Sequence, residues 1–282
     1  MCRLVAYLGQ NVLLEDVLVR PINSIVTQSL HARETRLPTN GDGFGLGWYA
    51  PEISLEPALF KSIYPAWNDE NLLHLTAKIK SPAFFAHVRA ASAGGVTHYN
   101  CHPFNHGRWM LMHNGEISSF LEIKRHLRRL LDDDMYQWIK GETDSEHLFA
   151  LFLQMSKGYD LSHVEVVSER LLATFEQINL LINEYAKAGP SYYNICLTDG
   201  QQLVATRYCT DRVITPETMH YAIGRGFIEK DKHFHMLPKA EGALSLLVAS
   251  ERLTNFESEW KDVPANHLMM VNRDKQIEML AL

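Results

Sequence analysis

The sequence predicts an α+β protein in which antiparallel sheets are covered by helices. Two observations lead to this prediction. Short apolar runs typical of strands dominate the first third of the chain, helical patterns fill the middle, and strand patterns return toward the end. This segregation favours antiparallel sheets, because parallel βαβ units would alternate strands with helices. No internal repeat or linker interrupts the chain, so residues 1–282 are interpreted as one domain.

Four short apolar runs in the first third of the chain are expected to form strands. They are residues 4–8, 43–48, 83–88 and 109–112. A helix is expected from about Ser119, because apolar residues recur there on one stripe and the arginines fall off it. The stripe consists of Phe120, Leu121, Ile123, Leu127, Leu130 and Leu131.

The second helix is expected to open at the sequence "TDSE", in which Thr143 and Glu146 have capping-box spacing. A third, longer helix is expected from about residue 162 to residue 188, since Gly189-Pro190 would end it. An Asp199-Gly200 turn between two apolar runs then predicts a hairpin over 192–208. The last predicted strands are residues 244–249 and 267–271.

The composition argues against several classes of function. With 27 basic and 33 acidic residues the formal net charge is -6, which disfavours nucleic acid or an anionic membrane as a partner. No apolar run is long enough to span a bilayer, and no signal peptide is recognised. The four cysteines form neither a disulfide framework nor a paired metal motif. A reduced, cytoplasmic protein is therefore expected.

Cys2 is the first candidate for chemistry. It directly precedes an apolar strand, so it is expected to be held firmly even though chain termini usually fray. Removal of Met1, which a small second residue permits, would give Cys2 a free α-amine beside its thiol. Such a residue combines a nucleophile with its own base.

Arg89 and the pair Asn114-Gly115 each follow an apolar strand. The planar guanidinium of Arg89 suits a carboxylate ligand, although a structural salt bridge is the favoured interpretation of this stretch alone. The side-chain amide of Asn114 and the main-chain N–H of Gly115 are two donors of the kind that form an oxyanion hole. A simple Asn-Gly turn is the alternative.

Asp144 lies in the first turn of the predicted helix, where main-chain N–H groups favour a charged carboxylate. It would hold a cation such as an α-ammonium group, unless it only caps the helix. The glycines of "NGDGFGLGWY" do not match a dinucleotide or phosphate loop. They would let either a ligand or another segment approach residues 41–47 closely, and the sequence leaves both open.

The histidines raise the question of a metal site. His98, His102 and His106 are spaced by four residues, which on a helix would place them on one face able to bind zinc. Pro103 and Gly107 argue against a helix there. No metal is therefore expected, and His102 is predicted to pack or hydrogen-bond behind the site.

In their order along the chain, these motifs resemble those of the class II glutamine amidotransferases, which are N-terminal-nucleophile hydrolases. The resemblance rests on Cys2 followed by "AHVRAAS", "CHPF", "HNGE" and "ETDSE", and it continues through "NGDGFGLGWY", "YPAWNDENL", "NICLTDGQQLVATRY" and "LLVASERL". The later stretches look like the stand-alone branch, which includes the γ-glutamyl hydrolase of ergothioneine biosynthesis and relatives acting on glutathione. The resemblance implies a four-layer αββα sandwich, with two antiparallel sheets between layers of helices.

By the same resemblance, Cys2 would be the nucleophile and its α-amine the general base, while Asn114 and Gly115 would form the oxyanion hole. The other site residues are expected to bind substrate: Arg89 its α-carboxylate, Asp144 its α-ammonium group, with His113 beside them. No cofactor is implied.

The implied activity is hydrolysis of glutamine or a γ-glutamyl compound through a γ-glutamyl thioester, with release of glutamate and ammonia or an amine. Two alternatives stay open: a glutaminase subunit that supplies ammonia to a separate synthase, and a catalytically silent sensor of a γ-glutamyl metabolite. The substrate is expected to be a small molecule. The leaving group is not identified, and Trp67 and residues 41–47 are candidates to line its side by resemblance only. The oligomeric state is also open, a homo-oligomer included.

Overall fold

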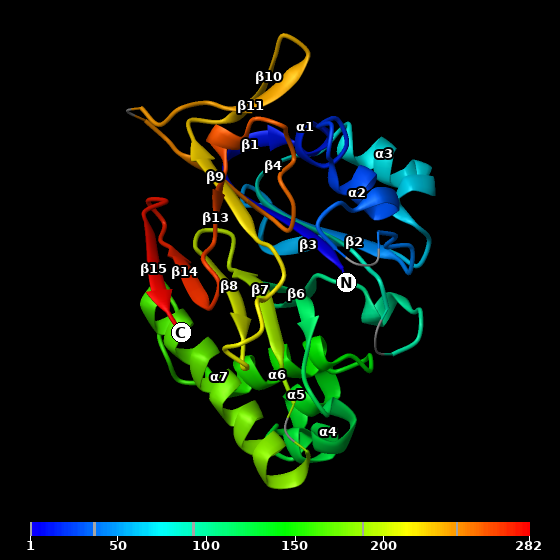
Figure 1. Cartoon of the computed structure of the whole chain (residues 1–282), viewed down its shortest axis with the longest axis vertical. Helices are drawn as coiled ribbons and strands as arrows, with labels where there is room; N and C mark the ends of the chain where they lie inside the picture. The colour runs from blue at the N-terminus through cyan, green and yellow to red at the C-terminus, as the bar shows by residue number, and fades with distance from the viewer. Residues whose placement is uncertain (1, 36–37, 92–93, 188, 241) are drawn as a thin grey trace.

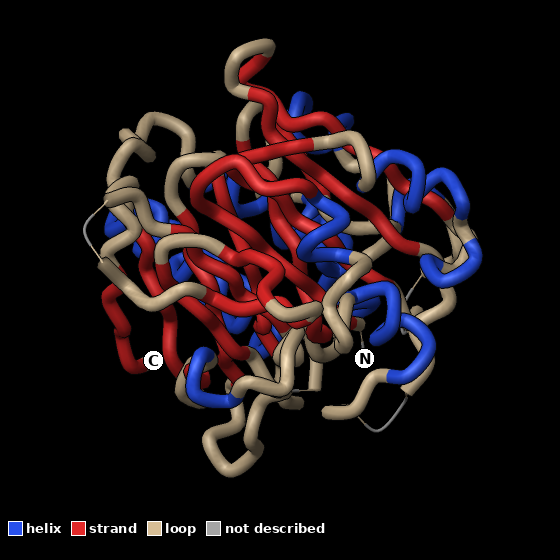
Figure 2. The backbone as a smooth tube through the Cα atoms, turned by 90° about the horizontal axis from the view of Figure 1, so that it is seen from above, coloured by secondary structure: helices blue, strands red, loops and turns tan. Residues whose placement is uncertain are grey.

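The computed structural model describes residues 2–35, 38–91, 94–187, 189–240 and 242–282. In these residues two antiparallel sheets are stacked face to face, and helices cover the outer face of each (Figure 1). This arrangement confirms the predicted α+β class and the four-layer αββα sandwich. Seen from above, the strands run side by side through the middle of the molecule (Figure 2).

The first sheet contains seven strands among the described residues, in the order β13-β9-β12-β1-β4-β2-β3. Their bounds are β1 Arg3–Leu13, β2 Phe44–Ala50, β3 Ser54–Ser62, β4 Lys80–Val88, β9 His220–Gly224, β12 Ser245–Ala249 and β13 Lys261–Asp262. Its outer face packs against three short helices, α1 (Leu14–Leu18), α2 (Ile25–His31) and α3 (Glu70–Thr76). A separate two-stranded hairpin, β10 (Phe227–Lys230) and β11 (His233–Met236), projects beyond this sheet (Figure 1).

The second sheet contains six strands in the described part of the chain, in the order β15-β14-β8-β7-β6-β5. Their bounds are β5 Phe104–His106, β6 Trp109–Glu116, β7 Tyr192–Thr198, β8 Leu203–Cys209, β14 His267–Val271 and β15 Ile277–Ala281. Four helices cover its outer face: α4 (Phe120–Arg128), α5 (Asp133–Trp138), α6 (Asp144–Met155) and α7 (Val164–Tyr185). The described residues also form three 3₁₀ turns, η1 (Ala66–Asn68), η2 (His98–Asn100) and η3 (Glu257–Glu259).

The inner faces of the two sheets share an apolar core. On β1, Leu4, Ala6 and Leu8 point into this core, while Val5 and Tyr7 pack on the helix side. Because both faces of each sheet are covered, the strands appear in the sequence as continuous apolar runs rather than as alternating patterns. This is why a short run such as residues 4–8 predicts a strand but does not indicate which side chains point to the inner core and which point to the helices.

The predicted strands and helices are all present, with some different ends. The first predicted helix ends at Arg128, so Leu130 and Leu131 lie beyond it, which corrects the predicted stripe. The long helix covers Val164–Tyr185, and the predicted end at residue 188 falls outside the described residues. Among the described residues, no helix is both long and apolar enough to cross a lipid bilayer.

Candidate active site

Cys2 lies at the start of β1, beside the segment that follows β4. Arg3 pairs with Val88, the last residue of β4, across the two antiparallel strands. The residues that directly follow β4 therefore lie opposite Cys2. The main-chain N–H of Ala90 donates to the Cys2 Sγ at 3.4 Å. The carbonyl oxygen of Cys2 accepts a hydrogen bond from Arg3 Nε at 2.7 Å. Residue 2 is therefore held at its side chain and at its main chain, as expected.

The surroundings of Cys2 favour the protonated thiol. Burial is the largest influence and raises the pKa of the thiol, and the Ala90 N–H bond and the nearby Arg89 and Arg3 charges offset only part of that rise. Because the thiolate is the reactive form, nucleophilic attack by Cys2 requires a base that removes its proton.

Arg89 follows β4 directly and is buried. Its Nη1 donates to the Gly95 carbonyl at 3.1 Å and its Nη2 lies 3.4 Å from the Gly94 carbonyl. Its main chain is fixed as well, because Arg89 N donates to Gly43 O and Asp42 N donates to Arg89 O. The guanidinium is thus a buried, oriented cation at the same sheet end as Cys2.

Asn114 and Gly115 lie at the far end of β6, in the second sheet. The Asn114 side chain is 1% exposed, and among the described residues neither its amide nitrogen nor its amide oxygen has a hydrogen-bond partner. Buried polar groups are normally bonded, so this amide is an exception that a bound ligand would explain. A Cβ at Gly115 would lie 2.0 Å from the Tyr192 carbonyl oxygen, which only a glycine avoids.

His113 is braced through both ring nitrogens. Its Nε2 is 2.8 Å from the Tyr192 carbonyl oxygen, which only accepts, so Nε2 carries the proton of this bond. Its Nδ1 lies 2.9 Å from Ser145 Oγ. The ring thereby connects β6 to α6 and to β7. The predicted role of His113 in substrate binding stays a prediction.

Asp144 is the first residue of α6 and is buried. One carboxylate oxygen accepts from Ile117 N at 2.8 Å and the other from Ser145 N at 2.7 Å. The carboxylate thus ties the start of α6 to the segment that leaves β6, next to Gly115. At this point Thr143 caps the helix, because its Oγ1 accepts from Glu146 N at 3.2 Å.

The predicted capping box is only half formed. Instead of returning to Thr143 N, the Glu146 carboxylate accepts from Lys140 N at 2.9 Å and from Gly141 N at 2.7 Å. Glu146 therefore shapes the loop before α6 while Thr143 alone caps the helix.

Strand β6, which carries Asn114 and Gly115, packs against β1 and β4 of the facing sheet, the strands that adjoin Cys2 and Arg89. His87 on β4 pairs in register with Leu4 of β1. The main chain of His113 lies close to the His87 ring and opposes the lowering of the His87 pKa by burial. The ring of His102 packs 4.2 Å from that of His87, centroid to centroid. His102 is therefore buried and packed, as predicted, and its place behind the site stays a prediction.

The remaining sequence motifs have structural roles. A Cβ at Gly45 would lie 1.9 Å from the His102 carbonyl oxygen, and one at Gly47 would lie 2.4 Å from Met110 Sδ. At these two glycines the close approach is therefore made by protein. In the described part of the chain no group of three or more histidine, cysteine or acidic side chains has the geometry to hold a metal ion.

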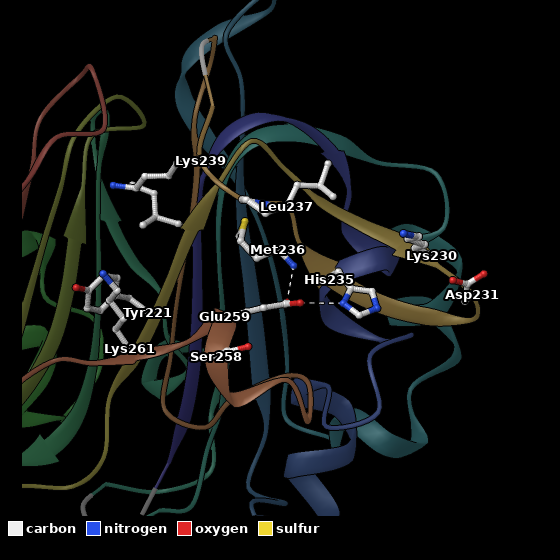
Figure 3. Close-up of a pocket in the computed structure, with 12 residues that line it drawn as sticks. Tyr221, Lys230, Asp231, His235, Met236, Leu237, Lys239, Ser258, Glu259 and Lys261 are labelled. Atoms are coloured by element: carbon white, nitrogen blue, oxygen red, sulfur yellow. Dashed lines mark hydrogen bonds and ion pairs between the residues drawn. The ribbon is translucent and has the colours of Figure 1, made fainter.

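A cavity of about 660 Å³ lies elsewhere, at the edge of the first sheet (Figure 3). It is lined from β9, β10, β11, η3 and β13, and Glu259 within it accepts from Met236 N and pairs with His235. Its lining contains none of the residues predicted from the sequence, so the predicted site and this cavity are different places.

Sequence reasoning did not single out Arg3, Ser145 or Tyr192. Tyr192 acts through its main-chain carbonyl, which leaves no signal in the residue type. Arg3 and Ser145 each adjoin a predicted site residue. The signal in the sequence was the charged Arg3 between Cys2 and an apolar run.

Comparison with known proteins gives a consistent result. Residues 13–281 match the family described as "Glutamine amidotransferases class-II", a match that begins after Cys2. The chain is 36% identical to the probable glutamine amidotransferase DUG3 of Saccharomyces cerevisiae, over 97% of this chain and 82% of that protein.

Two further similarities are informative. A stretch covering 42% of this chain and 50% of the relative is 29% identical to the gamma-glutamyl-hercynylcysteine sulfoxide hydrolase of Mycobacterium tuberculosis. The structure of a glutamine aminotransferase class-II domain protein from Silicibacter pomeroyi superposes with a TM-score of 0.70 at 23% identity, covering 100% of this chain and 99% of that one. At this identity the structural likeness shows the fold.

Proposed function

Because the chain belongs to the class II glutamine amidotransferase family, we propose that it is an N-terminal-cysteine amidohydrolase acting on a γ-glutamyl amide. Relatives of this family are named as glutamine amidotransferases and γ-glutamyl hydrolases, so hydrolysis of a linear amide is the chemistry of the family. The observation that best supports the finer proposal is the buried, unbonded amide of Asn114 beside Gly115, on the sheet that faces Cys2.

The first chemical step requires a base. With Met1 removed, the α-amine of Cys2 takes the thiol proton, and the thiolate attacks the γ-carbonyl carbon of the substrate. The Asn114 amide and the Gly115 N–H donate to the oxygen that becomes negative. The protonated amine then returns its proton to the leaving ammonia or amine. Water hydrolyses the resulting γ-glutamyl thioester and releases glutamate.

Substrate recognition follows from the charges at the site. A γ-glutamyl group carries an α-carboxylate and an α-ammonium group at its far end. The planar guanidinium of Arg89 matches the carboxylate, and the buried carboxylate of Asp144 matches the ammonium group. We assign His113 a positioning role, because its ring nitrogens bond to Ser145 and Tyr192. No cofactor takes part in this mechanism.

The test combines labelling with turnover. Intact-protein mass before and after treatment with a glutamine-mimicking diazo-ketone reports both loss of Met1 and addition of one label, which peptide mapping locates. Glutamate release is measured from glutamine and from γ-glutamyl amides with different leaving groups.

The proposal expects one label on Cys2, glutamate release by the unmodified chain, and neither in Cys2→Ala. Cys209→Ala is the matched control, since Cys209 is a buried thiol on β8, and it should retain both. Retained Met1, or full glutamate release by Cys2→Ala, would refute the mechanism.

A further inference from the structure

Arg3 is a buried cation that the proposed mechanism does not use. Its side chain is 0% exposed, although it directly follows the nucleophile in the chain. Arg3 Nε donates to the carbonyl oxygen of Cys2 at 2.7 Å, and Nη1 lies 3.4 Å from Glu251 Oε1. A second carboxylate, that of Glu217, is 3.8 Å from Nη2. The guanidinium therefore joins the main chain of the nucleophile to an acidic residue that follows β12.

Glu251 is also buried, and its carboxylate has hydrogen-bond partners besides Arg3. Its carboxylate accepts from the main-chain N–H of Arg33 at 2.9 and 3.0 Å and from that of Glu34 at 3.0 Å. Asn23 Nδ2 lies 3.4 Å from the same carboxylate. One side chain thus ties the segment after α2 to the residue next to Cys2.

Stability alone is a poor explanation of this pair. Removing two charges from water is costly, and well-packed apolar residues often replace buried ion pairs without loss of stability. The position of the pair offers a better reason. The first residue of a chain frays unless it is tied down, and a nucleophile displaced by about 1 Å loses a large part of its rate.

Two independent bonds hold residue 2. The Ala90 N–H fixes Sγ from the side of β4, and Arg3 Nε fixes the carbonyl from the side of β12. Since the carbonyl and the α-amine of one residue share a Cα, holding the carbonyl restricts where the amine and the thiol point.

We propose that Arg3 and Glu251 form a positioning pair that orients Cys2 for attack and couples it to the segment carrying residues 33 and 34. This inference rests on the proposed function of Cys2. Neither side chain contacts the substrate. The pair acts through the Cys2 carbonyl, so its loss affects the chemical step more than substrate binding.

The first test is Arg3→Lys, which keeps the charge but removes the Nε–H that bonds the Cys2 carbonyl. We expect kcat to fall by about tenfold to a hundredfold, as for a misplaced reacting group, while KM changes by less than about threefold. Arg108→Lys is the matched control, because Arg108 pairs with Asp199 at 3.0 Å at the opposite end of β6 from Asn114. It should lose stability without loss of kcat.

The second test measures the reactivity of the Cys2 thiol directly and does not depend on turnover of a substrate. The rate of iodoacetamide labelling at Cys2, located by peptide mass, is followed against pH in Glu251→Gln and in the unmodified chain. Glu251→Gln removes the nearer of the two negative charges beside Arg3 and leaves only the more distant Glu217, so the less compensated cation should move the labelling midpoint to lower pH. A change in overall stability would not shift this midpoint in that direction.

The outcomes separate the two proposals. Arg3→Lys with unchanged kcat would overturn the positioning role, and Glu251→Gln with an unchanged labelling midpoint would overturn the coupling of Glu251 to Cys2. Failure of the proposed function would appear in the unmodified chain as absence of glutamate release, while the labelling profile would still report on the pair.

Discussion

At the scale of the single residue, the proposed role of Asn114 makes a demand that opposes stability. Its amide is buried without a hydrogen-bond partner among the described residues. Such a group costs about 1–3 kcal/mol of stability when it is left unbonded. The neighbouring Gly115 has a related constraint, because any side chain there would collide with the Tyr192 carbonyl oxygen. The fold thus requires glycine at position 115, while the unbonded amide of Asn114 is explained by the proposed oxyanion hole.

Asn114→Ala should therefore separate activity from stability. Loss of one oxyanion donor lowers kcat by about 10²–10³, while removal of an unbonded buried amide leaves the unfolding temperature unchanged or raises it. Steady-state kinetics and thermal unfolding measure the two effects. In the control Gln202→Ala, a bonded buried amide that donates to Leu161 O is lost, so stability should fall and kcat should stay. A drop in unfolding temperature for Asn114→Ala would contradict this account.

At the scale of the element, β6 and the start of α6 show what local sequence can predict. The apolar run 109–112 predicted a strand that delivers Asn114 and Gly115 to its end, and the structure has β6 there. Thr143 marked the start of α6 correctly, because a cap acts on the N–H groups nearest to it in the chain.

Long-range pairing left no comparable signal. Val5 of β1 pairs with Ala249 of β12, and nothing in either run indicates that partner. The edge strand β3 contains Pro57 and exposed polar residues, so it lacked a strand pattern. The bracing of His113 and the pairing of Arg3 with Glu251 likewise depend on contacts between distant segments, which local patterns do not encode.

Strand β2 offers a test of how closely it packs against the segment that precedes β5. In Gly45→Ala the new Cβ would lie 1.9 Å from the His102 carbonyl oxygen, so backbone must move and the chain should lose about 1–3 kcal/mol of stability or more. Gly226→Ala is the matched control, since a Cβ there meets no described atom within 4 Å. Denaturant unfolding of both variants measures the difference. Equal stability of the two would show that the segment around His102 moves away from β2 without cost.

At the scale of the whole molecule, several histidines are buried in the neutral form. Burial lowers the pKa of His87 from 6.5 to about 3 and that of His147 from 6.5 to about 4. Burial also lowers the pKa of His102 well below 6.5. His147 is held neutral by its bonds as well, because its Nδ1 donates to Thr143 O and its Nε2 accepts from Arg128 Nε.

The direction in which stability changes with pH depends on whether the folded or the unfolded chain takes up protons first as the pH falls. Each of these histidines takes up a proton in the unfolded chain below its ordinary pKa of 6.5, whereas the folded chain resists until the lowered pKa is reached. Their contribution to stability is therefore complete above pH 6.5 and declines as the pH falls. For each histidine the slope is about 1.4 kcal/mol per pH unit within that window.

His147→Gln isolates one of these contributions. Denaturant unfolding at several pH values between the ordinary pKa of 6.5 and the lowered value of about 4 should show a shallower loss of stability in this variant, by about one proton. His74→Gln, at an exposed position on α3, should leave the slope unchanged. If both variants showed the slope of the unmodified chain, His147 would have to be protonated within the folded protein, and its bond from Arg128 could not exist at acidic pH.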